Sequence, residues 1–173
     1  MSMHGRIMLS EEEFLSLPDA SRKRELLDGE LIDLPPAKHY HSVIAKKLTH
    51  LLETVLDLYR VWPGMAYCLR HDRWLIPDVS VSWPDQPTER GWYKGSPMLA
   101  VEIASRGNTA EEIESKTVRY LEHGAAEVWV LYPIKQTIVV SRKNDIQRIG
   151  AGSAYYCELL GLNLISDFWV PEE

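Results

Sequence analysis

The sequence predicts an α/β fold in which a mixed β-sheet is flanked by α-helices, with a β-hairpin near the N-terminus. The first observation is a strand, helix and strand in succession, over residues 98–105, 110–123 and 126–133. This order favours a right-handed parallel crossover. The second observation is the pair Asp28-Gly29 between two apolar-rich runs, which supplies the left-handed residues that a tight hairpin turn requires.

Length and composition favour one domain. The chain has 173 residues, 45% of them hydrophobic, so we expect a single core and a single domain spanning 1–173. Cys68 and Cys157 lack metal-type or redox-type spacing, which is typical of reduced thiols in a cytoplasmic protein. Residues 1–14 have no signal-like apolar core and the strongly apolar run 128–132 is short, so we expect neither secretion nor a membrane.

Two more helices are predicted upstream of the crossover. Ser10 and Glu13 form a capping box, which indicates a short helix that ends near Pro18. A longer helix is expected from about His41 to Tyr59, because apolar residues recur there at helical spacing. The residues of this stripe are Ile44, Leu48, Leu51, Leu52, Val55, Leu58 and Tyr59.

The remaining strands are read from shorter patterns. Residues 65–70 and 77–83 are strand candidates, whereas 84–97 is rich in Pro and Gly and reads as a loop. Three segments after the crossover look like antiparallel additions to the sheet, and an irregular tail around Phe168 and Trp169 should follow them. The three segments are 137–142, 146–150 and 155–160.

Two carboxylates stand out because the rest of their strands is apolar or small. Strand alternation puts Glu102 on a face otherwise made of alanines, and Asp78 on a face shared with serines. If the two strands are neighbours, the carboxylates lie about 5 Å apart and repel unless a proton or a cation joins them. Oxygen ligands with the other positions left to water suit Mg²⁺, so both residues are candidate metal ligands.

Lys116 is the third candidate. On the predicted helix it shares a face with Ile113 and Tyr120, the face that should pack against the sheet, where a lysine needs an anionic partner. The crossover could bring its ammonium to the two carboxylates. There it could orient an attacking water or neutralise the charge of a phosphoryl transition state.

Structural interpretations stand beside these. Asp78 directly after Pro77 is also typical of a turn, Lys116 could pair with Glu112 at i, i+4, and Glu102 could form a buried ion pair with an arginine. The net charge of -6 weighs against a nucleic-acid partner, because affinity for phosphates comes largely from Lys and Arg. Carboxylates gathered around a cation nevertheless contribute to that charge.

The order of these residues along the chain resembles that of a known protein family. Pro77-Asp78, followed by Glu102 at the end of an apolar strand, resembles the PD-(D/E)XK nuclease signature. The segments RELLDGELIDLPP, PDVSV, LAVEIAS, EEIESKTVRYLEHG and AAEVWVLYP look like the Uma family of restriction endonucleases, roughly from Glu13 to Phe168. The resemblance implies a restriction-endonuclease-like fold and an endonuclease, dependent on Mg²⁺ or Mn²⁺, that hydrolyses phosphodiester bonds of DNA, often as a homodimer.

The resemblance also implies site residues. Its acidic pair falls on Asp78 and Glu102, and its lysine falls on the helix at Lys116. Glu30 and His41 match further site positions, although Glu30 could be a surface acid beside a turn and His41 a residue at a helix start. The sequence departs from the family pattern at 105–108, Ser-Arg-Gly-Asn in place of Ser-Pro-Ser-Thr, which affects substrate contacts more than metal binding.

Three other interpretations stay open. A catalytically silent nuclease-fold module that binds nucleic acid or a regulatory partner would suit the acidic balance of the chain. Hydrolysis of a small nucleotide would use the same metal chemistry. His39 and His41 could form a zinc pair, but no third ligand stands at a suitable spacing.

Overall fold

The computed structural model describes residues 6–18, 22–57, 60–165 and 169. Its central sheet has six strands in the order β12-β11-β10-β9-β6-β3. The pair β9–β10 is parallel and the other neighbours are antiparallel. The mixed sheet is therefore confirmed. Its strands are β3 (Val61–Pro63), β6 (Val79–Val81), β9 (Leu99–Ile103), β10 (Glu127–Tyr132), β11 (Thr137–Arg142) and β12 (Asp145–Ile149).

The predicted crossover is formed by α3 (Ala110–Glu122), which joins β9 to β10. Thr109 begins the helix with a capping box, in which Glu112 donates its backbone N–H to the threonine hydroxyl and accepts from the Thr109 N–H. Gly124, with φ at +105°, follows its end. Firm caps at both ends fix the phase of the helix, and so determine which side chains face the sheet.

A second sheet has the order β2-β1-β5-β4-β8-β7. Its predicted hairpin is confirmed, with Asp28 and Gly29 both at positive φ in the turn. The short helix α1 (Glu11–Leu15) begins at the expected capping box of Ser10. The strands are β1 (Arg24–Leu27), β2 (Glu30–Asp33), β4 (Tyr67–Arg70), β5 (Arg73–Leu75), β7 (Thr88–Glu89) and β8 (Trp92–Lys94).

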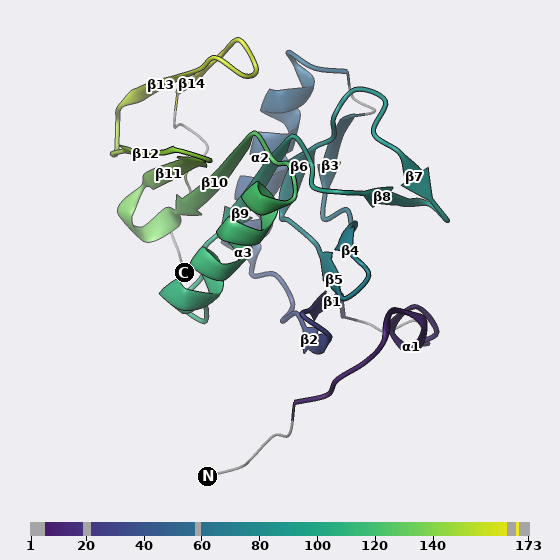
Figure 1. The fold of residues 1–173 in the computed structure, drawn as a ribbon. Helices are drawn as coiled ribbons and strands as arrows, with labels where there is room; N and C mark the ends of the chain where they lie inside the picture. Colours follow the sequence, from purple (N-terminus) through teal and green to yellow (C-terminus); the bar gives the residue numbers. More distant parts are fainter. Residues whose placement is uncertain (1–5, 19–21, 58–59, 166–168, 170–173) are drawn as a thin grey trace.

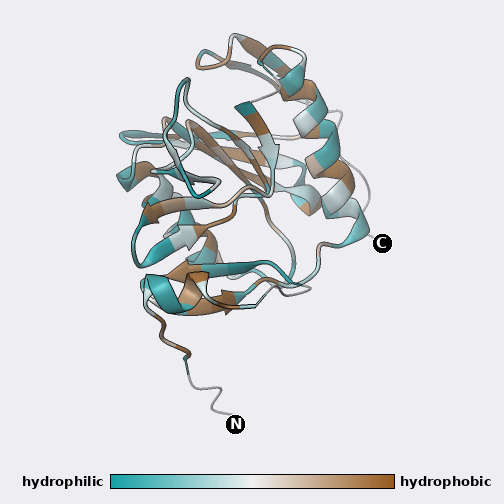
Figure 2. Cartoon of the chain, turned by 90° about the vertical axis from the view of Figure 1, so that its right-hand side faces the viewer, coloured by the Kyte–Doolittle hydropathy of each residue, from teal (hydrophilic) through white to brown (hydrophobic). Residues whose placement is uncertain are grey.

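Layers form on both faces of the central sheet. The helix α2 (His39–Glu53) buries Ile44 and Leu48 in a cluster with Val101 and Trp129. On the opposite face, Tyr120 of α3 packs with residues of β9 and β10 and with the second sheet. Figure 1 shows α3 in front of the central strands and α2 behind them, and Figure 2 shows long hydrophobic stretches in these strands. The face that carries Glu102 thus lies under α3 and beside the second sheet.

Several boundaries differ from the sequence prediction. The helix α2 ends at Glu53, short of the expected Tyr59, and Val55 of the predicted stripe is 43% exposed. Leu58 and Tyr59 lie outside the described residues. The expected loop 84–97 contains the short β7–β8 hairpin, whose turn places Arg90 and Gly91 at positive φ.

The prediction that residues 155–160 extend the central sheet is wrong. The segments β13 (Ala154–Cys157) and β14 (Leu162–Ile165) pair with each other in a separate sheet and do not extend the central one. A 3-10 turn, η2 (Pro133–Lys135), links β10 to β11. Trp169 packs partly buried against the core, and Phe168 lies outside the described residues. Among the helices described, none is long and apolar enough to cross a membrane.

Candidate active site

Asp78 and Glu102 lie at adjacent positions on neighbouring strands. The register of β6 on β9 pairs Val79 with Val101, and one further step sets Asp78 beside Glu102. The Asp78 N–H donates to the Val101 carbonyl at 3.0 Å, and the Ile103 N–H donates to Asp78 Oδ2 at 2.7 Å. The backbone of β9 therefore holds the Asp78 carboxylate at the end of the strand that carries Glu102.

Lys116 reaches Glu102 from α3. Its Nζ lies 3.3 Å from Glu102 Oε1 and 3.5 Å from Oε2, and its side chain is 18% exposed. The helical spacing predicted that Lys116 faces the sheet, and the structure places it there. The alternative pairing with Glu112 is wrong, because Glu112 instead caps the helix through the Thr109 N–H at 2.8 Å.

A second carboxylate, Glu25 of β1, holds the same ammonium. Its Oε1 lies 2.8 Å from Lys116 Nζ and accepts the Ile76 N–H at 2.8 Å, and the side chain is 2% exposed. Glu25 is not among the site residues that the sequence predicts. The available signal was a charged residue inside a short strand whose neighbours, Leu26 and Leu27, are apolar.

Two more side chains complete the cluster. The hydroxyl of Tyr120, one turn after Lys116 on α3, donates to Glu102 Oε1 at 3.0 Å. His41, in the first turn of α2, places Nε2 3.1 Å from Asp78 Oδ2. The structure thus brings four of the five sequence-predicted candidates together, and it adds Glu25 and Tyr120. We refer to these six residues as the acidic cluster: Glu25, His41, Asp78, Glu102, Lys116 and Tyr120.

Glu30 is the exception. It begins β2, and its described ion pair is with Arg6, at 3.6 Å and on the exposed side of the hairpin. No hydrogen bond or ion pair among the described residues joins it to the acidic cluster. The strand order places β1, not β2, next to the rest of the second sheet, so Glu25 is the hairpin acid that reaches the cluster.

Burial and charge shift the ionisation of the cluster. Burial, together with the neighbouring carboxylates Asp78 and Glu25, raises the pKa of Glu102 to about 8, although the Lys116 ammonium opposes this. Burial alone would lower the pKa of Lys116, but Glu102 and Glu25 raise it above its ordinary value. Burial and the same two carboxylates raise the pKa of Tyr120, so its phenol stays a hydrogen-bond donor.

The donor set fits one kind of cation. In the described part of the chain, no group of three or more His, Cys, Asp and Glu side chains is arranged to hold a metal ion, and so no third ligand joins His39 and His41 there. Mg²⁺, however, is commonly held by one or two carboxylates and several waters. Asp78 uses Oδ2 for its described contacts, so its second oxygen and the Glu102 carboxylate, which contacts Lys116 and Tyr120, are the groups that would hold such an ion.

Hydrogen bonds within the loop between β9 and α3 stabilise its conformation. Asn108 Oδ1 accepts from both the N–H and the hydroxyl of Ser105 at 2.9 Å. These bonds occupy the asparagine oxygen at the position where the family pattern has a threonine. The departure from the pattern therefore concerns the loop beside the cluster and leaves the carboxylates of the strands in place.

The fold is shared with a solved structure. A crystal structure described as a putative nuclease belonging to DUF820, from Anabaena variabilis ATCC 29413, is similar with a TM-score of 0.79 at 22% sequence identity. The match covers 92% of this chain and 96% of that one. The predicted restriction-endonuclease-like α/β fold is therefore confirmed.

The family is shown by a separate comparison. The model of the Uma2 family, described as "Putative restriction endonuclease", matches residues 11–161. The chain belongs to the Uma2 family, as its sequence motifs indicated. No curated protein matches the chain.

Proposed function

We propose that this protein is a metal-dependent endonuclease that hydrolyses phosphodiester bonds of DNA, with Asp78 and Glu102 as ligands of Mg²⁺ or Mn²⁺. One observation carries the proposal: a buried ammonium, Lys116, lies between Glu102 and Glu25 at the strand end beside Asp78. Membership of the Uma2 family supports a nuclease. The pair of carboxylates and the lysine suit phosphoryl transfer assisted by a divalent cation.

Glu102, Glu25 and Lys116 have distinct tasks in this proposal. A bound Mg²⁺ would activate a water and stabilise the charge of the phosphoryl group. Glu102 must lose its proton to become a ligand. Glu25 keeps the ammonium of Lys116 in place when Glu102 turns toward the cation, so that the ammonium can face the scissile phosphate.

His41 and Ile103 act on Asp78. The Ile103 N–H donates to Oδ2 at 2.7 Å and His41 Nε2 lies 3.1 Å from the same oxygen, so both contacts orient the carboxylate and leave Oδ1 available to a cation. We assign His41 a positioning role on this ground. Cleavage of both strands of a duplex is simplest for a two-fold dimer with one site in each subunit, so we propose a homodimer as the active form.

A second candidate function is a catalytically silent module that binds nucleic acid or a regulatory partner. The observation in its favour is that Lys116 already contacts both Glu102 and Glu25 without a cation. The net charge of -6 weighs against tight DNA binding in either function, and within the silent module it favours a regulatory partner over nucleic acid. Metal uptake separates the two functions, because a silent module has no need of a stoichiometric Mg²⁺ or Mn²⁺ site.

The experiment is a cleavage assay on supercoiled DNA with Mg²⁺ or Mn²⁺. We expect nicking that EDTA stops and that Asp78→Asn and Glu102→Gln abolish. The control is Asp33→Asn, since Asp33 is an exposed acid on β2 that pairs with Arg24 at 3.2 Å, away from the cluster. Cleavage that persists in either site variant would mean a contaminating enzyme, and no cleavage by the wild type would leave the binding module.

A further inference from the structure

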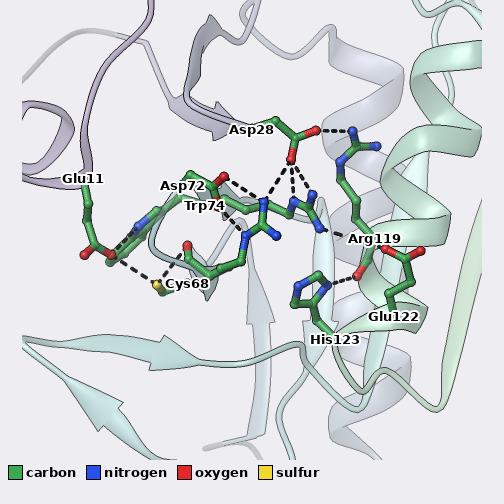
Figure 3. Close-up of polar contacts among 10 residues, drawn as sticks. Glu11, Asp28, Cys68, Asp72, Trp74, Arg119, Glu122 and His123 are labelled. Carbon is green, nitrogen blue, oxygen red and sulfur yellow. Dashed lines mark hydrogen bonds and ion pairs between the residues drawn. The ribbon is translucent and has the colours of Figure 1, made fainter.

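The tip of the β1–β2 hairpin is tied to three other segments. Asp28, in the turn, accepts hydrogen bonds from Arg73 Nε of β5 at 2.9 Å and from Arg119 Nη2 of α3 at 2.5 Å. Arg70 of β4 lies 3.8 Å from the same carboxylate. Figure 3 shows Asp28 at the centre of these contacts, facing Arg119 on the helix. One carboxylate therefore joins the second sheet to α3.

The Asp28–Arg119 contact repeats the arrangement of the Glu25–Lys116 contact inside the acidic cluster. Asp28 follows Glu25 by three residues along the hairpin, and Arg119 follows Lys116 by three residues along α3. Residues at i and i+3 lie on one face of a helix, about 4.5 Å apart along its axis. The hairpin and α3 are thus joined twice, by Glu25–Lys116 within the cluster and by Asp28–Arg119 outside it.

Arg119 is itself held firmly. Its Nη1 donates to the Ser115 carbonyl at 2.9 Å and also contacts the Ser115 hydroxyl. Its side chain is only 20% exposed, and among the described residues its Nε is buried without a hydrogen bond. Burial raises the pKa of Asp28, but hydrogen bonds from Arg119 and Arg73 outweigh it and lower the pKa below its ordinary value. The contact is therefore a fixed, charged pair.

Lys116 has no comparable constraint of its own. A lysine is a point charge on a flexible stem, so the place of its ammonium depends on its partners. Glu102 is fixed by the central sheet and by the Tyr120 hydroxyl. Glu25 belongs to the second sheet, and its distance from Lys116 depends on how the hairpin sits on α3.

We propose that Asp28 and Arg119 are positioning residues, which fix the hairpin on α3 so that Glu25 holds the Lys116 ammonium between itself and Glu102. The functional part of this inference rests on the proposed nuclease activity, whereas the structural part does not. The two parts are tested by separate measurements.

The first measurement is NMR of the Lys116 ammonium in ¹⁵N-labelled full-length protein, assigned by its loss in Lys116→Gln. Asp28→Asn and Arg119→Gln should each shift or broaden this signal, because Glu25 moves away from it. Asparagine tolerates the left-handed backbone of the turn, so Asp28→Asn should fold. Arg119→Lys, which keeps a cation, should restore the signal in part.

The matched control is Arg24→Gln, which removes a different ion pair of the same hairpin, Arg24–Asp33. It should leave the Lys116 signal unchanged. An unchanged signal in both Asp28→Asn and Arg119→Gln, or an equal change in Arg24→Gln, overturns the positioning role.

The second measurement is the rate of DNA cleavage. In Asp28→Asn and Arg119→Gln, kcat should fall about tenfold or more while KM changes little, because the misplaced ammonium acts in the reaction and not in substrate binding. In the Lys116→Gln background, Arg119→Gln should cause no further loss. An inactive wild type would count against the proposed nuclease and leave the NMR result intact, whereas independent losses in the double variant would overturn the proposed link through Lys116.

Discussion

Lys116 of α3 lies 2.8 Å from Glu25 of β1, so the ammonium of the crossover helix is bound to the second sheet as well as to the central sheet. A buried charge needs a partner of opposite sign and costs several kcal/mol without one. The same contact therefore has two consequences, one for the stability of the fold and one for the chemistry of the acidic cluster.

Glu25→Gln should destabilise the protein by about 3 kcal/mol, because it removes the charge of a buried ion-pair partner while keeping an oxygen for the Ile76 N–H. Urea unfolding measures this. The control is Glu114→Gln, an exposed acid on the same helix as Lys116, which should change the stability by less than about 0.5 kcal/mol. Equal stabilities of the two variants would contradict a buried Glu25–Lys116 pair.

Cation binding should strengthen with pH. Because burial and neighbouring carboxylates raise the pKa of Glu102 to about 8, a cation that binds Glu102 displaces a proton below that pH. The affinity for Mn²⁺ should rise from pH 6 to pH 8 and level off above it. Calorimetry in two buffers of different ionisation enthalpy measures the released proton. Glu102→Gln should abolish both the binding and the release, and binding without proton release would show that Glu102 is not involved.

The stability of the metal-free protein should fall as the pH rises, whereas the affinity for the cation should increase. The pKa of Glu102 is raised above 4.5, so the native state keeps a proton that the unfolded chain loses. This contribution is complete below about pH 4.5 and is lost as the pH rises through 8. The Tm should fall by several degrees between pH 6 and pH 9, and by less in Glu102→Gln. The same fall in both proteins would assign the effect to another group.

A buried ion pair with an arginine was one interpretation of Glu102. The structure has such a pair at Glu127 instead. Glu127 of β10 accepts Arg142 Nε at 2.8 Å and Trp129 Nε1 at 2.7 Å. Glu127→Gln should therefore lower the stability by about 3 kcal/mol, as measured by urea unfolding, and leave Mn²⁺ uptake at neutral pH unchanged. Loss of the cation in this variant would indicate that the acidic cluster responds to general destabilisation.

Strand alternation and helical periodicity were enough to predict the orientation of Glu102 and Lys116. Alternation placed Glu102 on its face because β9 is five residues long, and periodicity placed Lys116 because α3 has thirteen residues and clear caps. Glu25 was missed for the opposite reason: β1 has four residues, with two leucines in succession, and gives no readable alternation.

The choice between Glu25 and Glu30 depended on strand order. The two acids flank the same turn, and only the pairing of β1 with β5 makes Glu25 the inner one. Such pairing is set by tertiary packing, as is the end of α2 at Glu53. The catalytic roles and the single domain over 1–173 stay predictions.

Lys116→Gln separates binding from chemistry. If the ammonium acts on the phosphate in the transition state, its loss should reduce kcat about a hundredfold or more and leave KM for DNA nearly unchanged. Mn²⁺ uptake should persist, because Asp78 and Glu102 remain and Glu102 no longer contacts the lysine. Lys116→Arg provides a control that keeps the charge but alters its geometry. A Gln variant that cuts at the wild-type rate would show that the lysine serves only to hold α3 on the two sheets.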